Sequence, residues 1–237
     1  MAAAARVLVT RPEPGASHTA GRLKELGFSP LVLPLSETMP LAATVPPGAY
    51  DAVAITSVNA IRHADSALLA RLMHLPAYAV GEKTAAAAKS AGFADVAVAG
   101  GDGAALAAML AGALRPGARV LYLAGKVRRP DFERRAVAGG LVLTVCETYG
   151  TASIDYADAR ERLGDAPVDI ALVYSVFAAE ALVGLVERPE IADSFEKTRF
   201  LCLSRRIFES LPEQWKARAL ISERPDEQAL LVLLAAL

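Results

Sequence analysis

Two segments with the same spacing place a hydroxyl side chain directly after an apolar run. Asp51 and Ser57 flank one run, and Asp169 and Ser175 flank the other. In both runs the serine stands six positions after the aspartate. A buried strand that ends in a hydroxyl and opens a helix presents that hydroxyl beside free backbone N–H groups, which favour anions. The repeated pattern therefore predicts two similar α/β units and an anionic ligand.

Similar groups follow almost every predicted strand. The carboxyl ends of parallel strands meet at one edge of a sheet, where open α/β proteins bind their ligands. Hydroxyls, glycines and cations at this edge suit a carboxylated or phosphorylated ligand, and an ordinary helix cap is the alternative for each single Ser or Thr. The strand ends carry Thr10-Arg11, Ser57-Asn59, Gly81–Thr84, Gly125-Lys126, Tyr174-Ser175 and Ser204-Arg205.

Motifs for nucleotides, nucleophilic serine and metals are absent from the sequence. Gly101-x-Gly103 resembles part of a dinucleotide fingerprint, but it lacks the third glycine and follows a late strand. His18, His63 and His74 share no ligand spacing, and we expect all three on the solvated surface. The sequence therefore favours binding and positioning of an anion, with no metal and no cofactor.

Composition limits the possible classes of protein. The chain has 237 residues, 54% of them hydrophobic, which fits one large domain or two small ones. Its net charge of −1 gives no overall electrostatic attraction to nucleic acid or to an anionic membrane. Cys146 and Cys202 lie in apolar runs and are expected to be reduced core thiols. The first ten residues lack a signal-peptide pattern, and the apolar run 229–237 is too short to span a bilayer. A cytoplasmic protein is expected.

Short apolar runs alternate with helical patterns along the chain, which predicts an α/β fold with parallel sheets. Thr84 and Asp131 are predicted helix N-caps, and 38–49 is predicted to be a connection. Spacing alone predicts two contiguous halves. The predicted strands are 6–10, 30–35, 52–55, 77–80, 96–99, 119–123, 141–145, 169–174, 199–203 and 219–221. The predicted helices are 16–26, 58–72, 84–91, 104–114, 131–138, 155–163, 176–186, 205–211 and 227–237.

Six segments stand in the order typical of one known family and together span nearly the whole chain. They are VLVTRPE at 7–13, LKELGFSPLVLPL at 23–35, ITSVNAIR at 55–62, AVGEKTAAAAKSAGF at 79–93, VLYLAGKVRR at 120–129 and ETYGT at 147–151. In these segments the chain resembles the uroporphyrinogen-III synthase family.

The resemblance implies a fold that differs from two contiguous halves. It implies two similar parallel-sheet α/β lobes of the HemD type, joined by a two-stranded linker, with a cleft between them. The first lobe would comprise 1–36 plus 151–237 and the second 38–148, with linkers near 36–38 and 148–151. The N-terminal strand–helix–strand unit would then pack with the C-terminal third.

The resemblance also implies an activity in tetrapyrrole and haem biosynthesis. The family is a cofactor-independent carbon–oxygen lyase that cyclises hydroxymethylbilane with inversion of the last pyrrole ring, through a spiro-pyrrolenine, to uroporphyrinogen III and water. The expected partners are this small-molecule substrate and, transiently, hydroxymethylbilane synthase, with no nucleic acid and no membrane. A monomer is expected.

The resemblance assigns roles residue by residue. Tyr149 matches the family's linker tyrosine and is the candidate general acid or hydroxyl-positioning group, with a packed hinge aromatic as the alternative. The chain departs from the family at 203–207, where Leu-Ser-Arg-Arg-Ile replaces a Gly followed by Thr-Ala, so Arg205 either replaces backbone N–H contacts or marks a different loop. The expected substrate-binding residues are Arg11, Ser57, Asn59, Thr84, Lys126, Ser175 and Arg205.

Two other classes of protein remain compatible with the sequence. A non-catalytic bilobed cytosolic protein that binds a small anionic ligand would show the same layout, although the missing signal peptide disfavours a periplasmic binder. A nucleotide-using α/β enzyme is disfavoured because the glycine fingerprint is incomplete.

Overall fold

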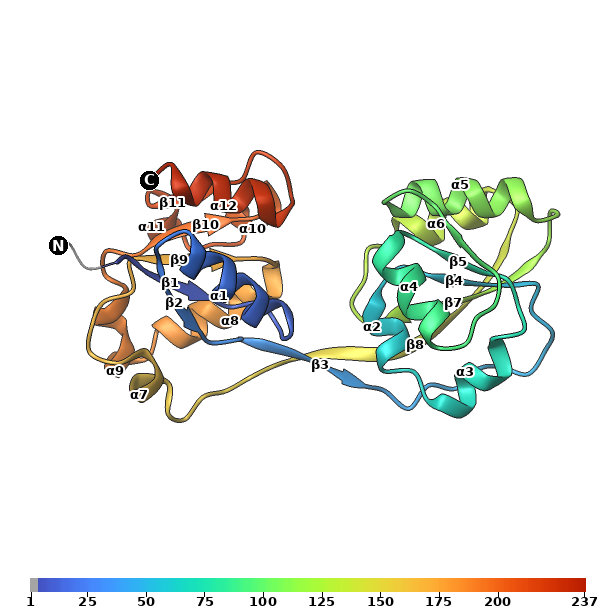
Figure 1. Cartoon of the computed structure of the whole chain (residues 1–237), viewed down its shortest axis with the longest axis horizontal. Helices are drawn as coiled ribbons and strands as arrows, with labels where there is room; N and C mark the ends of the chain where they lie inside the picture. The colour runs from blue at the N-terminus through green and yellow to red at the C-terminus, as the bar shows by residue number, and fades with distance from the viewer. Residues whose placement is uncertain (1–3) are drawn as a thin grey trace. The chain divides into compact units, whose positions relative to one another are not determined.

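The chain forms two compact units (Figure 1). The computed structural model describes residues 4–237, so Met1–Ala3, part of the stretch judged for a signal peptide, lie outside the described residues. Unit 1 comprises Met1–Glu37 and Ala152–Leu237, and unit 2 comprises Thr38–Thr151. Because unit 1 is discontinuous in sequence, the two contiguous halves predicted from spacing are wrong.

Unit 1 is built on a five-stranded sheet with the order β11-β10-β9-β1-β2. Its strands are β1 (Arg6–Val9), β2 (Ser29–Val32), β9 (Ile170–Val173), β10 (Arg199–Cys202) and β11 (Ala219–Ile221). All neighbours are parallel, and Val7 of β1 lies opposite Ile170 of β9. The N-terminal strand–helix–strand unit is therefore completed by the C-terminal third of the chain.

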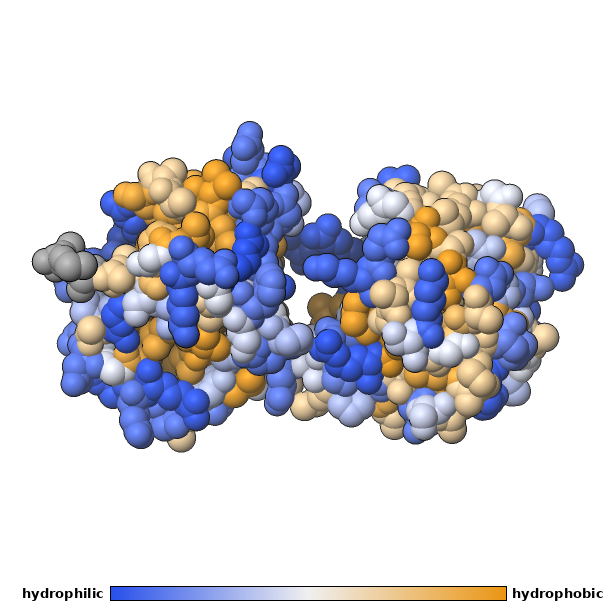
Figure 2. All heavy atoms as spheres, viewed as in Figure 1, coloured by the Kyte–Doolittle hydropathy of each residue, from blue (hydrophilic) through white to orange (hydrophobic). Residues whose placement is uncertain are grey.

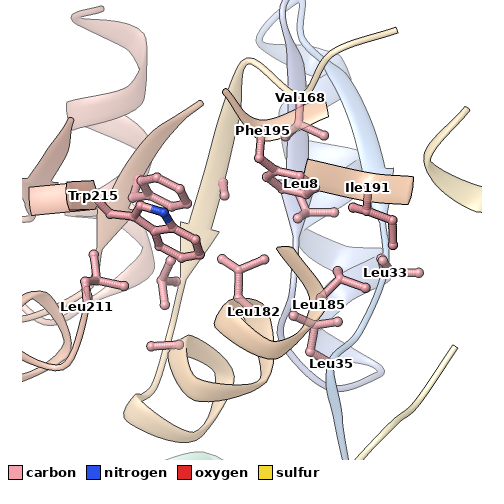
Figure 3. Close-up of a cluster of buried hydrophobic side chains, with 14 of the residues drawn as sticks. Leu8, Leu33, Leu35, Val168, Leu182, Leu185, Ile191, Phe195, Leu211 and Trp215 are labelled. Carbon is pink, nitrogen blue, oxygen red and sulfur yellow. The ribbon is translucent and has the colours of Figure 1, made fainter. Parts of the chain in front are cut away.

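Helices cover both faces of this sheet. The helices α1 (Gly15–Glu25) and α12 (Glu227–Ala235) pack on one face. The other face holds α8 (Val176–Val186), whose Leu182 and Leu185 lie near Leu8 of β1 (Figure 3). The remaining helices are α7 (Ala159–Leu163), α9 (Pro189–Ala192), the 3-10 turn η1 (Asp193–Phe195), α10 (Arg205–Glu209) and α11 (Glu213–Lys216).

Unit 2 is built on a six-stranded sheet with the order β3-β8-β7-β4-β5-β6. Its strands are β3 (Ser36–Pro40), β4 (Ala52–Ile55), β5 (Ala77–Ala79), β6 (Val96–Val98), β7 (Arg119–Gly125) and β8 (Val142–Ser153). The pairs β4–β5, β4–β7, β5–β6 and β7–β8 are parallel. The predicted α/β class with two similar sheets is confirmed, and the strands of both sheets are mainly parallel.

The edge strands β3 and β8 differ from the prediction of a coil at 38–49 and a short strand at 141–145. Leu41 N–H donates to the Thr148 carbonyl at 3.0 Å, and Ile154 N–H donates to the Leu35 carbonyl at 3.1 Å. One residue number rises as its partner falls, so β3 and β8 run antiparallel. β3 and the second half of β8 are largely polar and pair with each other, so no apolar run revealed them, whereas the apolar first half of β8 was predicted.

The sheet of unit 2 is also covered on both faces. Alternate residues of β4 point to opposite sides, so Ala54 packs with α5 (Gly103–Ala113) and α6 (Asp131–Ala138), whereas Ile55 packs with the other helices. Figure 1 shows α5 and α6 together above the strands. The opposite face is covered by α2 (Val58–Arg62), α3 (Ser66–Leu72) and α4 (Glu82–Ser90).

Three local predictions in unit 2 are wrong. The predicted helix 58–72 is broken into α2 and α3, and Asp65 caps the second of them by accepting from the N–H of Ala67. Gly81, not Thr84, precedes α4, and Thr84 lies inside that helix. Pro130 precedes α6, so Asp131 is its first residue and not its cap.

Hydrophilic side chains cover much of the face drawn in Figure 2, with hydrophobic surface over α12, where Val232 is exposed. None of the helices formed by residues 4–237 combines the length and the apolar character needed to cross a membrane. Cys146 and Cys202 are free and buried, as expected for core thiols.

Candidate functional site

Tyr149 reaches the carboxyl end of β7 from the neighbouring strand β8. A Cβ atom built on Gly125, the last residue of β7, would lie 2.6 Å from Cζ and 2.8 Å from the hydroxyl oxygen of Tyr149. The phenol therefore packs directly against the backbone of Gly125, and only glycine leaves room for it. The half-buried ring places its hydroxyl at the sheet edge where α/β proteins bind ligands.

The backbone around Tyr149 is fixed on both sides of the strand. Its carbonyl accepts from the Lys126 N–H at 2.8 Å, which joins it to the loop after β7. The adjacent Thr148 is fully buried, and its hydroxyl donates to the carbonyl of Ala60 in α2 at 2.8 Å. Strand β8 thus holds α2 on one side and the loop after β7 on the other.

His63, at the end of α2, contacts the same tyrosine. The two ring centroids lie 6.0 Å apart with the planes tilted by 31°, and the Nε2 atom of His63 is hydrogen-bonded to the hydroxyl of Thr38 at 2.8 Å. Burial, together with the charge of Arg62, lowers the pKa of His63, so the ring is neutral near pH 7. His63 is half-buried and hydrogen-bonded, so the expectation of a solvated surface residue holds only in part.

A cavity of about 500 Å³ opens at the carboxyl ends of the strands of unit 2. Its wall includes Thr56, which follows β4. It also includes Gly101 and Gly103, where the loop after β6 leads into α5. Arg128 and Arg129 also line it from the loop after β7, and of the two only Arg129 is exposed. Asp102 and Asp131 also line the cavity, and Asp102 caps the start of α5. The exposed Arg129 is therefore the lining group best suited to a carboxylated ligand.

Arg128 is held in place by two carboxylates. Its guanidinium donates to Glu133 at 2.6 Å and to Glu147 at 2.7 Å, and it also bonds the Gly125 carbonyl at 3.1 Å. Burial lowers the pKa of Arg128, but the hydrogen bonds with Glu133 and Glu147 outweigh it and raise the pKa above its ordinary value. Arg128 therefore orders the loop beside Tyr149 and is permanently charged.

The floor of the cavity contains a pair of hydroxyl groups. The Tyr122 and Thr56 hydroxyl oxygens lie 2.8 Å apart and share a hydrogen bond. Burial raises the pKa of Tyr122, an effect larger than the opposing hydrogen bond from Thr56. The edge of its ring packs against Phe132, with centroids 4.7 Å apart. Both hydroxyls are neutral hydrogen-bonding groups.

The corresponding edge of unit 1 has a cation that is already neutralised. Arg11, after β1, donates to Glu227 at 3.0 Å, and its guanidinium lies 4.7 Å from the centre of the Tyr174 ring. Burial raises the pKa of Glu227, but the hydrogen bond from Thr19 and the charges of Arg11 and Arg22 outweigh it and keep the pKa low. The charge of Arg11 is therefore balanced within the unit.

The hydroxyl of Tyr174 is the one buried side-chain oxygen or nitrogen among residues 4–237 that has no hydrogen-bond partner. Burial raises the pKa of Tyr174, so the group remains a neutral phenol. It stands at the end of β9, one residue before Ser175.

The structure divides the eight site residues predicted from the sequence between the two units. Unit 2 holds Ser57, Asn59, Thr84, Lys126 and Tyr149, and unit 1 holds Arg11, Ser175 and Arg205. Most of them lie just after parallel strands, whereas Tyr149 lies within β8 and Thr84 lies within α4.

Several of these residues also have structural roles. Ser57 caps α2 and Ser175 caps α8, each through its side-chain oxygen. Asn59 accepts from Arg62 at 3.2 Å, and Thr84 is only 5% exposed, which leaves little of its side chain for a ligand. Lys126, in contrast, is exposed.

Arg205 stands in an exposed position at the start of α10. Ser204, the residue before it, makes no side-chain cap to this helix. The loop that departs from the family pattern thus presents a cation at the edge of unit 1.

Sequence reasoning missed the residues that line the cavity. The run Arg128-Arg129-Pro130 is a basic signal in the sequence, and Gly101-x-Gly103, which resembles a dinucleotide motif, lies on the cavity wall. Tyr122 gave no signal because it lies within an apolar strand.

Residues 4–237 contain no cluster of three His, Cys, Asp or Glu side chains that could hold a metal ion. Burial raises the pKa of Cys202 to about 12 and also raises that of Cys146. Both thiols are therefore protonated and unsuited to nucleophilic chemistry.

Comparison with known proteins identifies the family. A solved structure of uroporphyrinogen-III synthetase from Helicobacter pylori matches with a TM-score of 0.70 at 20% identity, covering 98% of this chain and 99% of that one. A mutant uroporphyrinogen III synthase from Thermus thermophilus matches with a TM-score of 0.52 at 17% identity, covering 98% and 99%. No curated protein matches the sequence. Residues 17–232 match the family described as uroporphyrinogen-III synthase HemD, and the chain belongs to that family.

Proposed function

We propose that this protein converts hydroxymethylbilane into uroporphyrinogen III and water. The observation that carries the proposal is the family match over residues 17–232. The geometry of unit 2 supports it, because a half-buried phenol and the exposed cations Lys126 and Arg129 stand at one sheet edge.

The reaction needs acid assistance at one oxygen and control of one carbon–carbon bond. Departure of the terminal hydroxyl, with one added proton, gives water and an electrophilic azafulvenium cation. The last ring attacks through its substituted carbon to form a spiro-pyrrolenine, which opens and closes again with that ring inverted, and loss of one proton restores the pyrrole. Since the bilane also closes without inversion, selection of one attack geometry is the main catalytic task.

We assign the carboxylates of the substrate to the cationic and hydroxyl groups at the sheet edges. In unit 2 the candidates are Lys126, Ser57 and Asn59, with Arg129 added by the cavity. In unit 1 Ser175 and Arg205 are exposed, whereas Arg11 is already engaged by Glu227. Arg11 would thus contact a carboxylate only by exchanging its partner.

Tyr149 is the proposed catalytic residue. Its hydroxyl lies over Gly125 at the carboxyl end of β7, where it could donate a hydrogen bond to the departing hydroxyl of the bilane. No metal or organic cofactor is assigned to this step, because proton donation and orientation are sufficient for it.

The setting proposed is a cytoplasmic monomer that receives its substrate from hydroxymethylbilane synthase. Direct transfer would protect the bilane, which otherwise cyclises spontaneously to the uninverted isomer. This arrangement would be detected as a higher yield of isomer III when both enzymes are present together than when free bilane is added.

The direct test is incubation of the protein with freshly prepared hydroxymethylbilane, followed by oxidation and separation of the uroporphyrin isomers. We expect isomer III as the main product, with isomer I dominating in a heat-denatured control. If only isomer I forms at every protein concentration, the synthase assignment fails, and ligand binding without turnover would favour a non-catalytic binder.

A further inference from the structure

The short helix α2 ends beside the proposed catalytic tyrosine for a structural reason. In a continuing helix the carbonyl of Ala60 would accept from the N–H of Ala64. Here the Ala60 carbonyl accepts from the Thr148 hydroxyl at 2.8 Å, and the Ala64 N–H turns to Ile61 at 3.2 Å. The helix therefore stops at its fifth residue, and the side chain of His63 projects from its end.

At this position His63 has two partners that come from two different strands. Thr38 belongs to β3, and its hydroxyl binds the Nε2 atom of His63 at 2.8 Å. Tyr149 belongs to β8, and its ring centroid lies 6.0 Å from that of His63. The hydrogen bond fixes the orientation of the imidazole, and the imidazole in turn limits the positions open to the phenol.

The phenol meets a second, rigid neighbour at Gly125. Its Cζ and hydroxyl oxygen lie so close to that backbone that a Cβ atom would overlap them. Backbone cannot move aside as a flexible side chain can, so His63 is the adjustable contact of the two.

We propose that His63 is a positioning residue for Tyr149, fixed by Thr38, and that this contact sets the rate of the cyclisation rather than the affinity for the bilane. The proposal rests on the proposed function for its kinetic part only. The imidazole does not touch the substrate in this account and acts through the phenol ring.

A set of matched variants separates the ring contact from the hydrogen bond. His63→Gln removes the ring but keeps a group that can bond Thr38, and His63→Phe keeps a ring but loses that bond. Thr38→Val frees the imidazole without removing it. His74→Gln is the control, because His74 is an exposed histidine of the same unit and has no part in the site.

The kinetic readout is formation of uroporphyrinogen III. We expect His63→Gln to lower kcat about fivefold, with KM changed by less than twofold, and His63→Phe to recover part of the loss. In a Tyr149→Phe background the His63→Gln change should have no further effect. An equal effect in both backgrounds, or an effect on KM alone, would overturn the proposal.

A second readout does not depend on activity. Protein labelled with 13C at the tyrosine ζ-carbon gives one NMR signal per tyrosine, and Tyr149→Phe identifies the signal of Tyr149. That signal should shift or broaden in His63→Gln and Thr38→Val and stay unchanged in His74→Gln.

The two readouts separate the two hypotheses. A wild-type protein that makes no isomer III rejects the proposed function, whereas the NMR signal still decides the contact between His63 and Tyr149. An unchanged Tyr149 signal in folded His63→Gln and Thr38→Val overturns the positioning role. If His63→Gln does not fold, Thr38→Val and His63→Phe carry the test.

Discussion

The strand–helix pairs β4–α2 and β9–α8 begin in the same way and end differently. Asp51 accepts from the Arg119 N–H at 2.7 Å, and Asp169 accepts from the Arg6 N–H at 2.7 Å. In each pair the aspartate thus fixes the start of the neighbouring strand. Each strand is then followed by a serine that caps the helix.

The difference lies in helix length. Helix α2 has five residues and α8 has eleven, because Thr148 takes the carbonyl of Ala60 in unit 2. In unit 1 the longer helix carries Leu182 and Leu185 into the hydrophobic core (Figure 3). The same local pattern therefore builds a core in one unit and brings His63 to Tyr149 in the other.

A change at Gly125 should disturb only the unit 2 copy. In Gly125→Ala the new Cβ would overlap the Tyr149 ring and displace it, so kcat should fall by roughly 10- to 100-fold, the cost of a misplaced catalytic group. The control is Gly112→Ala in α5, where a Cβ meets nothing within 4 Å. Equal kcat values for the two variants would mean that the position of the phenol is unimportant.

Thr148→Val tests why α2 is short. The variant keeps the shape of the side chain and leaves the buried Ala60 carbonyl without its partner, so the free energy of unfolding should fall by about 1–3 kcal/mol. Urea unfolding measures the loss, and Thr151→Val, at a half-buried position on the same strand, is the comparison. No greater loss than in Thr151→Val would show that Thr148 does not hold the helix end.

The two capping serines allow a direct comparison of the copies. Ser57→Ala and Ser175→Ala should each cost about 1 kcal/mol of stability through the lost cap. If Ser57 and Ser175 also bind carboxylates, each change should raise KM for the bilane as well. Replacement by Gly at the same positions restores most of the capping and should keep the KM effect. A normal KM in both Gly variants would leave only the structural role.

As the pH falls, the stability contributed by His63 in unit 2 should be lost before the stability contributed by Glu227 in unit 1. Burial and Arg62 lower the pKa of His63, so the folded state favours the neutral ring and loses stability as the pH falls below about 6.5, down to the folded pKa. The low pKa of Glu227 gives stability that is present above about pH 4.5 and is lost as the pH falls through its folded value.

Unfolding free energies measured between pH 7 and 4 for the wild type, His63→Gln and Glu227→Gln check this order. The slope of the wild type near pH 6 should weaken in His63→Gln, and the slope below pH 4.5 should weaken in Glu227→Gln. Identical slopes in all three proteins would contradict both assignments.

Local sequence predicted the parts of the fold that local forces determine. The apolar runs of β4 and β9 and the capping serines could be identified because burial and capping leave a pattern in neighbouring residues. The sequence also contained a signal for the split of α2 from α3, because Asp65 is a typical N-cap residue directly before an apolar helical pattern. The prediction of one long helix over 58–72 overlooked this signal.

Contacts between distant residues left no such pattern. Arg11 and Glu227 are 216 residues apart, so nothing near Arg11 indicates that its charge is balanced. The hydrogen bond of Thr148 to Ala60 spans 88 residues and cannot be read from either segment. The position of the Tyr149 ring depends on Gly125, a glycine whose need is evident only in three dimensions.

The rate of uroporphyrinogen III formation by Tyr149→Phe tests the central claim most directly. The phenol hydroxyl at the sheet edge of unit 2 is proposed to assist departure of the bilane hydroxyl, and such assistance contributes about 100-fold or more. We predict a kcat lowered by about 100-fold with unchanged thermal unfolding, whereas Tyr50→Phe should retain the wild-type rate. A folded Tyr149→Phe protein that forms isomer III at the wild-type rate would contradict the account.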